Sequence, residues 1–159
     1  MNDYSSLLLL PSKVKNIILL SHFSINKYSN LIILPNELVS LTSLTHLVIN
    51  RYSSLISLPN EFENLTSLIH LTTSNSSSLT LLSNKLKNIT SLTHLSINNC
   101  YKLISLPNDL KNITSFIHLN INECSSLTLL PNELLNLTLL TTLPNELGKI
   151  ISLIRLSIN

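Results

Sequence analysis

The segment SLTHLVINRYSSLISLPNEFENLT, residues 43–66, is one full unit of a 24-residue repeat. The dipeptide Leu-Pro marks the period because it returns at the same interval along the chain. It stands at 10–11, 34–35, 58–59, 106–107 and 130–131, and Leu82-Ser83 occupies the one gap. A fixed period of this length indicates a solenoid, in which each unit covers the apolar side of its neighbour.

The apolar positions inside the unit predict its local structure. Leu47 and Ile49 alternate with His46, Val48 and Asn50, and this alternation is typical of a short strand with one buried side. The segment that begins at Pro59 suits a turn or the first turn of a short helix. We therefore expect strands near residues 22–26, 46–50, 70–74, 94–98, 118–122 and 155–159.

The consensus L-x-x-L-x-I-x-x-[Y/C]-x-x-L-x-x-L-P-N-E-L-x-N-L-T-S resembles the leucine-rich-repeat family over nearly the whole chain. Its L-x-x-L-P part is similar to the repeats of plant disease-resistance receptors and related intracellular proteins. The resemblance implies an α/β leucine-rich-repeat solenoid, with a curved parallel sheet on the concave side and short helical turns on the convex side. It also implies one domain over residues 1–159 that binds proteins in immunity or signalling.

Composition limits the other classes of function. The chain has 44% hydrophobic residues and a net charge of +2, which argues against disorder. Its 10 basic residues form no run, so nucleic acid is not an expected partner. Residues 1–10 carry neither a signal peptide nor a membrane span, and two cysteines are too few for a disulfide framework. A cytoplasmic protein without contact to a membrane is the resulting expectation.

Three irregularities interrupt the repeat. The third unit has Thr73, Ser76 and Ser83 where its neighbours have Ile, Tyr or Cys, and Pro, so we expect local softness there. A 13-residue surplus lies within 116–152, either as a convex bulge that leaves the sheet continuous or as a truncated repeat that kinks it. Both ends of the array lack a polar cap, which suggests a fragment of a longer protein.

All histidines of the chain fall in one column of the repeat: His22, His46, His70, His94 and His118. We expect them to form a ladder on the concave face, with neighbours near 5 Å. Such a ladder suits metal capture or a pH switch, but we favour the explanation that repeat duplication copied one strand-compatible residue. A flat ladder offers poor tetrahedral geometry for zinc, so metal binding is the remote alternative.

A second polar column runs beside the histidines and consists of Asn26, Asn50, Asn98, Asn122 and Asn159, with Ser74 in the gap. It suits a groove that hydrogen-bonds a peptide or a carbohydrate, or an asparagine ladder that satisfies itself. Side chains that vary between units are better candidates for specificity. The candidate binding residues are therefore the five histidines with Asn26, Val48, Asn50, Arg51, Asn98, Asn120, Asn122 and Glu123.

The remaining motifs have structural explanations. Tyr52, Cys100 and Cys124 share an inward column and are expected to pack, although the two cysteines could approach each other across the stack. The recurrent Asn-x-Thr triplets formally match glycosylation acceptors, and glycans on Asn64 or Asn112 would favour a secreted or effector-type protein. With a single glycine and no catalytic motif, the sequence predicts a protein-binding scaffold that is not an enzyme and needs no cofactor.

Overall fold

The computed structural model describes residues 20–26, 32, 34, 38, 40–108, 110, 113, 115 and 117–128. Five strands occur in this part: β1 (His22–Asn26), β2 (His46–Asn50), β3 (His70–Ser74), β4 (His94–Asn98) and β5 (His118–Asn122). Each strand predicted within these residues is confirmed with the same bounds.

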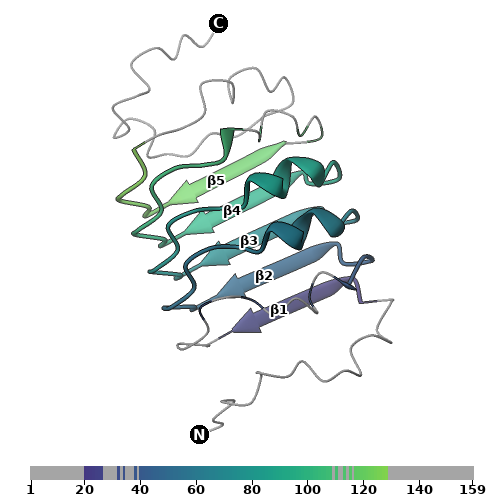
Figure 1. Cartoon of the computed structure of the whole chain (residues 1–159), viewed down its shortest axis with the longest axis horizontal. Coiled ribbons are helices and arrows are strands. Elements are labelled where there is room, and N and C mark those ends of the chain that lie inside the picture. Colours follow the sequence, from purple (N-terminus) through teal and green to yellow (C-terminus); the bar gives the residue numbers. More distant parts are fainter. Residues whose placement is uncertain are drawn as a thin grey trace, which may run out of the picture.

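The strands form one open parallel sheet in the order β1-β2-β3-β4-β5. Figure 1 shows them side by side with their arrows pointing the same way. Equivalent residues of successive repeats are paired throughout, as His46 with His70 and Asn50 with Ser74. Each column of the repeat therefore becomes a straight row across the sheet.

Alternation along each strand decides which side of the sheet is buried. In β2 Leu47 and Ile49 are fully buried, whereas His46, Val48 and Asn50 are half-buried. The buried leucines and isoleucines of the described units join one continuous core. Burial of each such side chain contributes roughly 1.5–3 kcal/mol, and a unit obtains this burial only from its neighbours.

Short 3-10 helices cover the side of the core opposite the sheet. The two described ones are η3 (Asn60–Asn64) and η4 (Asn84–Asn88), visible as coils in front of the strands in Figure 1. Pro59 is the N-cap residue of η3, and Phe62 carries its apolar side into the core. The expected short helical turns are confirmed, and both are 3-10 helices of five residues.

Hydrogen bonds between consecutive repeats hold the helical side together. The Asn88 amide donates to Glu63 Oε2 at 2.5 Å, and Lys85 Nζ lies 3.8 Å from the same oxygen. The Ser91 hydroxyl donates to the carbonyl oxygens of Thr66 and Leu68, at 2.7 and 2.8 Å. The Thr-Ser pair that ends each repeat thus has a structural role, since its serine bonds to the preceding unit.

The third repeat keeps the common geometry despite its substitutions. Thr73, Ser76 and Ser83 are all buried, and β3 pairs with both neighbours without a shift. The Thr73 hydroxyl donates to Ser76 Oγ at 3.5 Å, at the limit of a hydrogen bond. The Ser83 hydroxyl oxygen accepts from the Lys85 N–H at 3.1 Å and so caps η4 in place of proline. Softness of this repeat stays a prediction.

Several expectations lie outside the described residues. These are the sixth strand near 155–159 and the character of both ends of the array. The 13-residue surplus was expected within 116–152, and the part of that range after residue 128 is also outside the described residues. Within the described part, no helix has the length and apolar character needed to cross a bilayer.

Candidate functional site

The outer face of the sheet is the candidate site. We define the outer face as the first, third and fifth residues of β1 to β5, which point away from the core. Its first residues are the five histidines and its last residues are asparagines or Ser74. Its middle residues are Ser24, Val48, Thr72, Ser96 and Asn120. Of the predicted binding residues, all but Arg51 and Glu123 lie on this face, and those two directly follow β2 and β5.

The five imidazole rings form a stack that we call the histidine ladder. Successive ring centroids are 4.1, 4.3, 4.1 and 4.3 Å apart from His22 to His118. The first three pairs are stacked with interplanar angles of 11°, 14° and 27°, and the last pair is tilted by 34°. The spacing is somewhat shorter than the 5 Å expected from strand separation.

Hydroxyl groups next to the ladder fix the orientation of several rings. Thr45 Oγ1 lies 2.9 Å from His46 Nδ1 and Thr93 Oγ1 lies 2.6 Å from His94 Nδ1. Each of these hydroxyl groups also donates to a backbone carbonyl, Thr45 to Ser21 at 2.8 Å and Thr93 to Ile69 at 3.3 Å. Nδ1 is thereby directed toward the protein, and Nε2 is the nitrogen left for a ligand.

The protonation of the central rings is disfavoured. Partial burial lowers the pKa of His46, His70 and His94, and the positive charges of neighbouring rings lower it further. At neutral pH these three rings are therefore uncharged, and the middle of the outer face has no formal charge from them.

Asparagines at the ends of the strands donate hydrogen bonds to neighbouring side chains of the outer face. Asn26 and Asn98 each donate from Nδ2 to the hydroxyl of Ser24 or Ser96 on the same strand, at 3.0 Å. Asn98 also reaches the Ser74 hydroxyl of the adjacent strand at 3.4 Å. For Asn26 and Asn98, these contacts support the interpretation of a ladder that satisfies itself.

A feature that the sequence did not reveal follows the strands β2 to β5. Arg51, Asn75, Asn99 and Glu123 occupy one column and all have the left-handed backbone conformation, with φ between 54° and 63°. This turn lets the Arg51 N–H donate to the Ser74 carbonyl at 2.9 Å, and the next two units repeat the bond. Two asparagines in the column were the available signal, because asparagine tolerates this conformation better than most residues.

The inward column behaves as predicted. Tyr52 and Cys100 are fully buried and Cys124 is nearly so. Both cysteines are free thiols, and each donates to the carbonyl two residues earlier, at 3.5 Å. A hydrogen bond from Cys124 lowers the pKa of Cys100, although burial opposes this effect. The two cysteines do approach each other across the stack, inside the core and away from the outer face.

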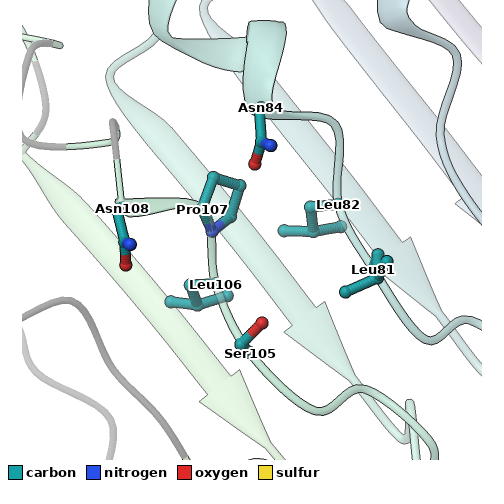
Figure 2. Close-up of a pocket in the computed structure, with 7 residues that line it drawn as sticks. All are labelled: Leu81, Leu82, Asn84, Ser105, Leu106, Pro107 and Asn108. Atoms are coloured by element: carbon teal, nitrogen blue, oxygen red, sulfur yellow. The ribbon is translucent and has the colours of Figure 1, made fainter.

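A small cavity of about 320 Å³ lies between two consecutive repeats on the side of the helical turns. Figure 2 shows its lining, which consists of Leu81, Leu82, Asn84, Ser105, Leu106, Pro107 and Asn108. None of these side chains is titratable near neutral pH, so the lining contributes no general acid or base. Among the described residues, no three His, Cys, Asp or Glu side chains are grouped to hold a metal ion.

No protein-family model matches this sequence, and no curated protein matches it. Solved structures do. A leucine-rich-repeat protein of Leptospira interrogans aligns with a TM-score of 0.56 and 22% identity, over 85% of this chain and 51% of that one. The chain thus spans about half the length of this neighbour.

Two further structures align less well. The leucine-rich repeat domain of the type III effector XopL is 14% identical over 81% of this chain and 78% of its own, with a TM-score of 0.32. Internalin C2 of Listeria monocytogenes is 16% identical over 69% of this chain and 79% of its own, with a TM-score of 0.23. The repeated sequence, the in-register parallel sheet and the Leptospira structure together establish this chain as a protein of the leucine-rich-repeat fold.

Proposed function

We propose that the chain is a non-enzymatic binding module that holds a protein or peptide on the outer face of its sheet. The observation that carries this proposal is the continuous register of β1 to β5, which aligns equivalent side chains in unbroken rows. Side chains differ between units at Val48 and Asn120 within the strands, and at Arg51 and Glu123 directly after them. Variation on a rigid platform is how repeat proteins distinguish partners.

The character of the face favours many modest contacts over one dominant contact. Its strand positions are small or polar, and the described ones include neither a large aromatic residue nor a carboxylate. Anchor residues of the tryptophan, tyrosine and arginine type usually dominate tight interfaces. Affinity would therefore be spread over the rows of the sheet, with Arg51 and Glu123 as charged contacts at its margin.

A paired set of variants tests the location of the site. His46→Arg together with Asn50→Arg places two bulky charges on the outer face, whereas Asn60→Arg with Asn84→Arg places the same charges on exposed positions of η3 and η4. Proteins captured by the wild-type chain from cell extract are quantified by mass spectrometry. We expect the first variant to lose them and the second to retain them. Retention by the first variant with loss by the second would place the site on the helical side.

We further propose that this binding takes place in the cytoplasm and serves recognition in immunity or signalling. Support comes from the resemblance of the repeats to intracellular receptors and from the two free, buried thiols of Cys100 and Cys124. Asn64 and Asn88 stand exposed within Asn-x-Thr triplets and would be glycosylated in a secreted protein. Mass spectrometry of the native protein should find them unmodified, and glycans on either would contradict a cytoplasmic site.

A further inference from the structure

The histidine ladder presents nitrogen atoms of one kind to a ligand. Thr45 Oγ1 lies 2.9 Å from Nδ1 of His46, and Thr93 Oγ1 lies 2.6 Å from Nδ1 of His94, so the protein engages Nδ1 of both rings. Nε2 is therefore the nitrogen that each ring presents to a ligand, and in the protonated ring it carries an N–H that can donate.

Few charged groups surround the ladder. The strand positions of the outer face other than histidine are Ser, Thr, Val and Asn, none of which titrates. The charged groups at its margin are Arg51 after β2 and Glu123 after β5. Tyr52, Cys100 and Cys124 are buried in the core. The other described ionisable side chains lie on η3 and η4 or in the loop that follows β4: Glu61, Glu63, Lys85, Tyr101 and Lys102. A proton taken up by a central ring is therefore not neutralised by a described carboxylate.

Because the rings lie so close together, an anion bound from outside the chain favours protonation of the ladder. Rings 4.1–4.3 Å apart lie well within the screening length of physiological salt, which is about 8 Å, so neighbouring imidazolium groups repel one another. Partial burial and this repulsion lower the pKa of His70. An anion bound along the row relieves the repulsion and raises the pKa, and by linkage protonation strengthens anion binding.

We propose that the histidine ladder binds an extended acidic segment of a partner protein and that its rings take up protons as they do so. This inference rests on the proposed function of the outer face as a protein-binding surface. The two oxygens of one carboxylate can accept hydrogen bonds from the Nε2–H groups of two neighbouring rings. The five rings span about 17 Å, which is the length of about five residues of extended peptide.

The row of asparagines favours a peptide as the polyanion. Asn50 and Asn122 present amide groups that contain both donors and acceptors, parallel to the ladder and on the same face. Peptide bonds of an extended segment also contain both. A phosphate polymer would use the charges of the ladder but could offer only acceptors to the amides.

The test uses the whole chain and a hexaglutamate peptide, with a hexaglutamine peptide as the uncharged control. Calorimetry at about pH 5.5 and about pH 7.5 brackets the ordinary range of histidine titration. We expect the glutamate peptide to bind more tightly at the lower pH, by about tenfold per pH unit for each proton taken up. The glutamine peptide should show no such dependence.

Two sets of variants assign the effect to the ladder. His46→Gln, His70→Gln and His94→Gln together should abolish the pH dependence, while Lys85→Gln with Lys102→Gln removes cationic groups elsewhere and should leave it intact. Melting followed by circular dichroism checks that each variant is folded. If the triple variant does not fold, His70→Gln alone should reduce the number of protons taken up on binding, measured in buffers of different ionisation enthalpy.

Several results would overturn the inference. These are equal affinity at both pH values, unchanged pH dependence in the folded ladder variant, or tighter binding of polyphosphate or a DNA oligonucleotide than of the peptide. If the peptide does not bind but His46→Arg/Asn50→Arg still loses partner capture, this inference is refuted and the proposed function stands. If the double variant captures partners as well as the wild-type chain does, the proposed function itself is refuted.

Discussion

Replacing Arg51 with asparagine tests how the chain leaves each strand. Arg51 has φ 63°, a left-handed conformation that costs an ordinary residue about 1–2 kcal/mol. Asn75 and Asn99 occupy the same position in later repeats, and their amides donate to Asn50 and Asn75 at 3.0 Å. Because asparagine reduces the conformational cost and the exposed amide bond adds little, we expect Arg51→Asn to raise the free energy of unfolding by about 1 kcal/mol.

Thermal and urea unfolding measure this change. For a chain of this size the melting temperature should rise by about 2–4 °C. Arg51→Lys is the matched control, since it keeps the charge and the backbone cost, and it should leave stability unchanged. Glu123→Asn lies three repeats away, so its gain should add to that of Arg51→Asn. A lysine variant as stable as the asparagine variant, or destabilisation by Arg51→Asn, would refute the argument from backbone strain.

Three other changes have defined outcomes. Leu71→Ala opens a cavity in the shared core and should lower the unfolding free energy by about 2–5 kcal/mol in urea melts, whereas outward Thr72→Ala should change it by less than about 0.5 kcal/mol. Thr73→Ile restores the residue found at Ile49 and Ile97 and should stabilise by about 1 kcal/mol, and loss of stability would show that β3 has no room for it. The fold lowers the pKa of three central histidines from 6.5, because their charged forms are disfavoured there. The neutral rings therefore contribute stability above pH 6.5, and this contribution to the free energy of unfolding should vanish as the pH falls through the pKa values of the folded state. Urea melts across this range should show it, and the triple glutamine variant should show less; an equal pH slope in both would contradict the account.

The repeat period explains why so much of the fold could be predicted. Each of the five-residue strands β1 to β5 has the predicted bounds. In each unit, residues equivalent to Leu47 and Ile49 alternate with outward-pointing residues, and the 24-residue spacing leaves one way to stack the units. The inward positions of Tyr52 and Cys100 followed from the same columns. Local pattern and global architecture agree here, which is the condition under which sequence alone specifies a fold.

The features that escaped prediction depend on details that a period does not contain. The left-handed conformation of Arg51 and Glu123 could not be inferred from residue types that normally avoid it. The orientation of His46 depends on the Thr45 hydroxyl and its bond to Ser21, a contact between two repeats. The cavity next to Leu81 forms where two loops stack, and no motif marks it. All candidate binding residues except Arg51 and Glu123 lie on the outer face, and the role of the whole set in binding stays a prediction.

Ring-to-ring nuclear Overhauser effects among the histidines would measure the stacking of the repeats most directly. Centroids 4.3 Å apart for His46 and His70, and 4.1 Å apart for His70 and His94, should give strong cross-peaks between rings that are 24 residues apart in sequence. A chain whose units lie apart would give a resolved histidine spectrum without these cross-peaks. That result would contradict the shared core, and with it the rows of side chains on the outer face.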